Sequence, residues 1–146
     1  MRRSIIIIFI ILISAAGCTR AHTTGERLAA RPPIDASSLV SRVHFRTASD
    51  EVRGGEVRAI EKNAGWMRDN AAAVLVLEGH CDERGSEESN LELGDRRARS
   101  VMEGMMARGV SSERLIVLSK GEDEPVDPGH GPASWRRNRR VEFIIR

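Results

Sequence analysis

The fold of this chain is decided by residues 74–105, which read VLVLEGHCDERGSEESNLELGDRRARSVMEGM. The continuous apolar run at residues 74–77 is typical of a strand that is buried on both faces. After a polar loop, Ser86 is a good helix N-cap, and Glu87 and Glu88 occupy the first turn, where acidic side chains are favourable. The segment therefore predicts a strand, a loop and a helix in succession.

The predicted helix carries an apolar stripe that consists of Leu91, Ala98, Val101, Met102 and Met105, at steps of three, four and seven residues. Gly109 is a natural C-terminal stop for this helix. Upstream, residues 43–45 predict a short first strand. A first helix ending near Asn70 is indicated by Val57, Ile60, Ala64 and Met67. Downstream, residues 115–118 predict a third strand, residues 121–132 an acidic loop rich in Gly and Pro, and residues 141–145 a last strand.

The order of these elements is β-α-β-α-β-β, which predicts a small α/β fold of the α+β sandwich type. We expect one mixed four-stranded sheet covered by two main helices, within a domain at residues 39–146. Strands separated by helices favour parallel pairs with right-handed crossovers. The last strand follows without a long helix, so we expect it to add antiparallel to the sheet.

The first residues are typical of an export signal. Arg2 and Arg3 form a basic start, and residues 5–13 are a nine-residue apolar run that spans roughly 14 Å as a helix, about half of a bilayer core. This length indicates a signal peptide at residues 1–17 rather than a membrane span. Residues 18–38 contain Pro32-Pro33 and no apolar periodicity, which predicts a flexible tether.

Cys18 is a candidate lipidation site. Ala15-Ala16-Gly17-Cys18 resembles a bacterial lipobox, although Leu is the usual residue at the position of Ala15. In lipoproteins of this type, Thr19 after the cysteine implies the outer membrane, which would place the domain in the periplasm. The alternative is ordinary cleavage after Ala16 with an incidental cysteine.

The charge of the chain excludes some partners. The net charge of +2 comes from Arg2 and Arg3, and from residue 18 onward basic and acidic side chains balance at 21 each. Binding of duplex nucleic acid through a dominant basic field is therefore not expected. Aromatic residues are 3% of the chain and Tyr is absent, which argues against a stacking platform for single strands. Arginine outnumbers lysine 21 to 2, which suits a planar carboxylate or phosphate ligand, or merely reflects codon composition.

The densest polar segment, residues 78–86, connects the buried strand to the following helix. Ligands of α/β sheets favour this end of a strand, and helix N-terminal amides attract anions. Gly79–Gly85, Asn90, residues 93–98 and residues 138–143 together resemble the peptidoglycan-binding signature of the OmpA C-terminal domain family, most closely that of its lipoprotein members. The resemblance covers residues 41–146.

The resemblance implies that the domain binds the diaminopimelate residue of peptidoglycan. By position, Asp82 would take the ligand's ammonium group and Arg97 its carboxylate. Further contacts are expected from Asn90, Gly85 and Ser86, and a weaker one from Arg139. The implied partners are peptidoglycan, the outer membrane through the lipid anchor, and TolB with other Tol-system proteins.

Each residue also has a purely structural interpretation. Asp82 could cap its loop, Asn90 could hold it, Arg97 could be a solvated helix charge like Arg96 and Arg99, and Arg139 could be a charge that flanks a strand. Two departures from the family pattern stand out. Residues 45–49 read FRTAS, where the family commonly has Asp or Ser after the Phe, and Cys81 replaces Ala, Thr or Ser, as a small half-buried filler.

An enzymatic role rests only on His80, Cys81 and Asp82. Neighbouring residues in an extended segment point in opposite directions, so His80 and Cys81 are not expected to form a catalytic pair. The His and acidic residues do not have the spacing of a zinc site, and we expect no cofactor, no metal and no catalytic residue. The remaining alternative is the same fold in another envelope machine, or docked on a protein partner.

Overall fold

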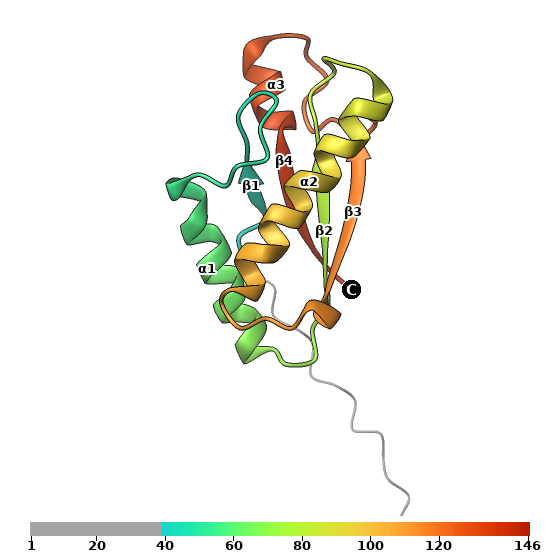
Figure 1. The fold of residues 1–146 in the computed structure, drawn as a ribbon. Coiled ribbons are helices and arrows are strands. Elements are labelled where there is room, and N and C mark those ends of the chain that lie inside the picture. The colour runs from blue at the N-terminus through green and yellow to red at the C-terminus, as the bar shows by residue number, and fades with distance from the viewer. Residues whose placement is uncertain (1–38) are drawn as a thin grey trace, which may run out of the picture. The chain divides into compact units, whose positions relative to one another are not determined.

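The structure, a computed structural model, describes residues 39–146 (Figure 1). The predicted signal peptide, Cys18 and the tether lie outside the described residues. The elements along the chain are β1 (Arg42–His44), α1 (Gly54–Asp69), β2 (Leu75–His80), α2 (Glu87–Met106), the single 3-10 turn η1 (Ser112–Arg114), β3 (Leu115–Gly121), α3 (Pro132–Asn138) and β4 (Arg140–Ile145). The predicted fold class, a mixed four-stranded sheet with two main helices, is confirmed.

The strands form one sheet in the order β1-β4-β2-β3. β2 and β3 are parallel, with Leu75 opposite Leu115, and β4 runs antiparallel to both β2 and β1. The predicted parallel pair around the second helix and the antiparallel last strand are thus confirmed. β1 and β2 are not neighbours, because β4 lies between them.

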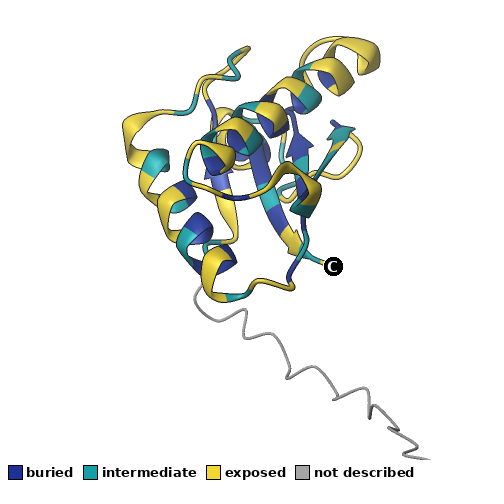
Figure 2. Ribbon diagram, turned by 60° about the horizontal axis from the view of Figure 1, so that its bottom comes forward, coloured by how far each residue is buried: buried dark blue, intermediate teal, exposed yellow. Residues whose placement is uncertain are grey.

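Helices α1 and α2 pack over one face of the sheet, and their buried sides meet the strands in an apolar core (Figure 2). The buried residues of α2 are Asn90, Gly94, Arg97, Ala98, Val101 and Met105. The prediction that Leu91 belongs to the buried stripe is wrong, since 36% of it is exposed. The helix is rotated so that Gly94 faces the sheet.

The other face of the sheet is only partly covered, so the prediction that the second strand is buried on both faces is wrong. Leu75 and Leu77 are fully buried, whereas Val76 between them is half-buried. Leu118 on β3 and Ile144 on β4 are 41% and 39% exposed. The reason is that both long helices lie on the same face. Within residues 39–146, no helix has the length and apolar character needed to cross a membrane.

The ends of the long helices follow the local sequence signals. The Ser86 hydroxyl accepts the backbone N–H of Ser89 at 3.2 Å, as an N-cap should, and Asn70 caps the end of α1. α2 ends at Met106, and Gly109 adopts a left-handed φ of 85° shortly after it. The sequence patterns did not predict α3, a short helix that begins with Pro132 at its N-terminus.

A close backbone contact joins β2 to α2. A Cβ atom built on Gly79 would overlap the carbonyl oxygen of Gly94, so neither backbone leaves room for a side chain at this point. Glycine at residue 79 therefore lets α2 lie directly on the end of β2. This contact places the first half of α2 beside the loop that follows β2, where the candidate site lies.

Candidate functional site

A cavity of about 120 Å³ lies at the carboxyl end of β2. Its walls come from the loop after β1, the loop after β2, the first half of α2 and the residue after α3; they include Thr47, Asp82, Arg84, Asn90, Arg97 and Arg139. The fold thus brings together four of the residues singled out in the sequence. Gly85 and Ser86 are not among the residues that line this cavity.

Asp82 is buried in the wall of the cavity and is surrounded by guanidinium groups. Its Oδ1 accepts Arg84 Nε at 3.0 Å, and its Oδ2 accepts Arg84 Nη2 at 2.8 Å and Arg139 Nη1 at 2.9 Å. Burial opposes ionisation, but the hydrogen bonds from Arg84 and Arg139 outweigh it and hold the pKa of the Asp82 carboxyl below its usual range. Asp82 is therefore an anion at neutral pH.

Arg97 is fully buried and is bonded mainly to backbone. Its guanidinium donates to Ser49 O at 2.9 Å, His80 O at 2.8 Å and Arg46 O at 3.0 Å, and to Cys81 Sγ at 3.3 Å. These bonds use four of its five N–H groups and leave one on Nη2. Arg97 thus ties the loop after β1 to the end of β2, unlike Arg96, whose side chain is 51% exposed.

Arg139 has more donors left than Arg97. Its Nε donates to Phe45 O at 3.1 Å and its Nη1 to Asp82 Oδ2 at 2.9 Å. Three of its five N–H groups have no partner among the described residues. Its side chain is 11% exposed, so these donors are positioned at a partly solvated wall of the cavity. The guanidinium fork available to an incoming carboxylate is therefore mainly that of Arg139.

Asn90 and Cys81 organise the loop beside Asp82. Asn90 Nδ2 donates to Asp82 O at 3.2 Å and also contacts a carboxylate oxygen of Glu122, while Gly85 turns with a φ of 123° against the Asn90 amide. Cys81 is buried rather than half-buried, because its thiol donates to Asn90 O at 3.2 Å under α2. Burial raises the pKa of this thiol, which disfavours the thiolate.

Sequence reasoning missed Arg84, which covers Asp82. Besides its bidentate contact with Asp82, its guanidinium lies 4.2 Å from the centre of the Trp135 ring on α3. The Trp135 indole in turn donates to Glu83 Oε1 at 2.8 Å. Arg84 is 42% exposed, so water can solvate its guanidinium when it leaves Asp82. An Arg two residues after an Asp in a turn was the signal that could have found it.

The sequence also raised a His80–Cys81 catalytic pair and a metal site. The ring nitrogens of His80 make no hydrogen bond to any described residue, the Cys81 thiol included. In the described part of the chain, no group of three or more His, Cys, Asp or Glu side chains is arranged to hold a metal ion.

The protein is a small α+β sandwich with both long helices on one face of the sheet. An acidic side chain and arginines lie together at the end of its parallel strands. Residues 45–139 match the model of the OmpA family, and the chain belongs to this family. The resemblance inferred from the sequence is thereby confirmed.

The relatives also identify the type of member that the chain resembles. It is 39% identical over 104 residues to the peptidoglycan-associated lipoprotein of Pseudomonas aeruginosa, covering 71% of this chain and 61% of that protein. It is 31% identical over 151 residues to the protein of the same name from Mesorhizobium japonicum, covering 96% and 90% of the two chains.

Solved structures of two differently named proteins have a similar fold. The peptidoglycan-associated lipoprotein of Burkholderia pseudomallei has a TM-score of 0.72 at 30% identity, covering 73% of this chain and 91% of that one. The C-terminal domain of Helicobacter pylori MotB has a TM-score of 0.68 at 25% identity, with coverage of 73% and 84%.

Proposed function

We propose that this chain is a non-catalytic outer-membrane lipoprotein that binds peptidoglycan and tethers the membrane to the wall. The observation that carries the proposal is the cavity in which the Asp82 carboxylate lies beside the guanidinium groups of Arg97 and Arg139. The family and the names of the relatives support this assignment of the ligand.

The ligand group is the free end of diaminopimelate, which carries an ammonium and a carboxylate on one carbon. Its ammonium would displace Arg84 from Asp82, because the two cations compete for the same carboxylate oxygens. Its carboxylate would accept hydrogen bonds from Arg139 and from the remaining N–H of Arg97. Charge-assisted bonds of this kind contribute about 1.5–3 kcal/mol each.

In this proposal the remaining predicted residues, Asn90, Gly85 and Ser86, do not bind the diaminopimelate end directly. Asn90 holds the backbone from Asp82 to Arg84 through bonds to Asp82 O and Arg84 O. Gly85 and Ser86 shape the turn into α2 and its N-cap, and their amides would reach a longer portion of the stem peptide. In this proposal Arg97 both fixes the cavity and binds the ligand.

Anchoring at Cys18 would explain how a small cavity with weak affinity can still attach the protein firmly to the wall. A lipidated cysteine would hold the chain at the outer membrane, and a coil of about 20 residues between it and the domain has a mean span of roughly 25 Å. With the domain confined near a repeating polymer, the effective concentration of sites is high, so weak binding at each site gives firm attachment.

The protein is, in this proposal, a Pal-type member of the Tol–Pal system that also contacts TolB. The likeness to the MotB domain favours one alternative, a wall-anchoring subunit of another envelope machine. Co-purification from cross-linked envelopes separates the two, because capture of TolB supports the first and capture of a motor or secretion complex without TolB supports the second.

Binding to the wall is tested by sedimenting the full chain, purified in detergent, with isolated sacculi. The Asp82→Asn variant keeps the shape of the side chain and removes the charge that would hold the ammonium. Asp95→Asn is the matched control, since Asp95 pairs with Arg99 on the exposed side of α2. We expect Asp82→Asn to lose most of the sedimented fraction and Asp95→Asn to retain it. Equal binding by both variants would refute the assigned site.

A further inference from the structure

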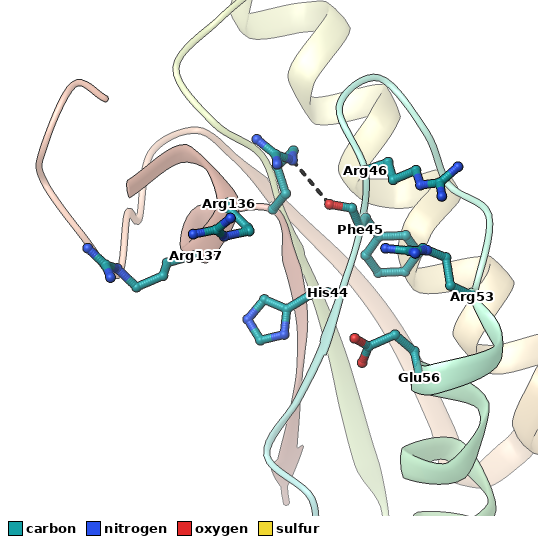
Figure 3. A pocket seen from close by; sticks show the side chains of 8 residues that line it. His44, Phe45, Arg46, Arg53, Glu56, Arg136 and Arg137 are labelled. Atoms are coloured by element: carbon teal, nitrogen blue, oxygen red, sulfur yellow. Dashed lines mark hydrogen bonds between the residues drawn. The ribbon is translucent and has the colours of Figure 1, made fainter. Parts of the chain in front are cut away.

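A second and larger cavity, of about 450 Å³, adjoins the first. We call it the arginine cavity, because its lining includes Arg46, Arg53, Arg136, Arg137 and Arg139 and a single carboxylate, that of Glu56. Figure 3 shows Arg46 and Arg53 on the side of α1, Arg136 and Arg137 on the side of α3, and His44 between them. Arg139 lines both cavities, so the two are neighbours that share this side chain.

Most of the positive charge of the arginine cavity is not neutralised. Arg137 pairs with Asp127, and Arg139 pairs with Asp82. By contrast, Arg46, Arg53 and Arg136 have neither an ion pair nor a side-chain hydrogen bond within residues 39–146. Basic and acidic residues balance over the chain from residue 18 onward, so this excess is local rather than a consequence of bulk composition.

The cavity is formed by fixed backbone. Arg97 holds the loop after β1 by donating to Arg46 O at 3.0 Å and Ser49 O at 2.9 Å, and Arg139 holds Phe45 O at 3.1 Å. Arg53 is the N-cap residue of α1, and Arg136 lies on α3. The free guanidinium groups therefore project from three anchored backbone positions, so no loop has to become ordered when they bind an anion.

Arg46 is also the residue at which this chain departs from the family pattern. The family commonly has Asp or Ser after the Phe of the first strand, and this chain has Arg46 after Phe45. The departure replaces an acidic or neutral group with a cation at the rim of the cavity. Guanidinium groups bind planar oxyanions such as carboxylates in a forked geometry.

We propose that the arginine cavity binds further carboxylate groups of the stem peptide whose diaminopimelate occupies the Asp82 cavity. This inference rests on the proposed function. Stem peptides carry several carboxylates along a short chain, and Arg139, which lines both cavities, places the two cavities next to each other. The three free arginines are exposed, so their contribution is screened by salt.

The test compares the wild-type chain with a variant that carries Arg46→Gln, Arg53→Gln and Arg136→Gln. The matched control carries Arg58→Gln, Arg99→Gln and Arg146→Gln, which removes the same charge at exposed positions away from the cavity. Binding of each full chain to sacculi is measured at low and high salt. An exposed charge pair is worth roughly a factor of two, so we expect the cavity variant to bind about eight-fold more weakly at low salt. We expect the control to bind like wild type.

A second arm uses sacculi whose free carboxyl groups have been converted to amides. Both cavities then lose their carboxylate ligands, so binding of the wild type should weaken and the difference between the wild type and the cavity variant should disappear. Equal binding of the two chains to untreated sacculi would overturn the proposal. If the cavity variant bound sacculi like wild type but had lost binding to pyrophosphate, the cavity would be assigned to a phosphate ligand instead. Failure of the proposed function gives a different result, because the wild type itself then does not bind sacculi. That result would overturn both proposals.

Discussion

Acidification should destabilise this protein through His80. The imidazole lies at the end of β2 with its side chain 1% exposed, and neither ring nitrogen has a hydrogen-bond partner among the described residues. Burial, together with the nearby Arg140, lowers the pKa of His80 to about 4, against the partial opposition of Glu142 and Glu124. The nearest carboxylate oxygen, Glu78 Oε2, is 3.9 Å from Nε2, too far for a hydrogen bond.

The pKa of His80 therefore falls on folding, from 6.5 to about 4. As the pH drops below 6.5, the unfolded chain takes up a proton that the folded chain excludes, so stability is complete above this pH and decreases toward pH 4. Each pKa unit corresponds to about 1.4 kcal/mol, which gives a loss of roughly 2 kcal/mol at pH 5. That loss is a substantial part of the about 5–15 kcal/mol that holds a domain folded.

The assay is urea unfolding of the full chain at pH 7 and pH 5. Replacing His80 by Met keeps a side chain of similar size and removes the titrating group. His44→Gln, at a half-buried histidine on β1, is the matched control. All other titrating groups are common to wild type and His80→Met, so the variant should lose about 2 kcal/mol less than wild type or His44→Gln between the two pH values. A difference below about 0.5 kcal/mol would refute this account of His80.

Four other substitutions have definite expected outcomes. Arg97→Met should lower the free energy of unfolding by about 3 kcal/mol or more, because it removes the donor to the buried His80 carbonyl and the bonds that hold the loop after β1, and the urea midpoint measures this. Gly79→Ala should cost a similar amount in the same assay, because its Cβ would overlap backbone of α2, whereas Gly55→Ala, which meets open space in α1, should stabilise by about 0.5–1 kcal/mol. Arg84→Gln should raise affinity for sacculi about two- to five-fold by uncovering the cavity carboxylate, and unchanged or weaker binding would show that Arg84 does not compete with the ligand.

The main elements were predictable because each has a local physical signal. The apolar run of β2, the Ser86 cap and the spacing of the helical residues decide their structure within a few residues of sequence. α3 was missed because it is a short polar helix, although Pro132 at its start was an available signal. The partly exposed face of the sheet was missed because apolar composition does not show which side the helices will cover.

The sequence predicted which residues lie at the site more completely than it predicted what each of them does there. Arg97 lies within a run of charges, but it also lies three residues after Gly94 and four before Val101, which is the buried stripe of α2. That spacing could have shown that the side chain enters the core. The arginine cavity had no such signal, because Arg46, Arg53 and Arg136 meet only after the loop after β1, α1 and α3 have been assembled.

The place of β4 in the sheet affects how the domain folds. β4 lies between β1 and β2, and its pairing with β1 joins residues 100 positions apart, such as Arg42 and Glu142. Contacts between such distant segments form slowly, because a long loop must close before they are made. A chain that lacks β4, whether still being synthesised or cut by a protease, has no hydrogen-bonded neighbour for β1 and one unpaired edge on β2. Pairing of β4 with β1 is therefore expected late in folding, so a substitution in β4 should mainly speed unfolding, whereas an equally buried one in β3 should slow folding more.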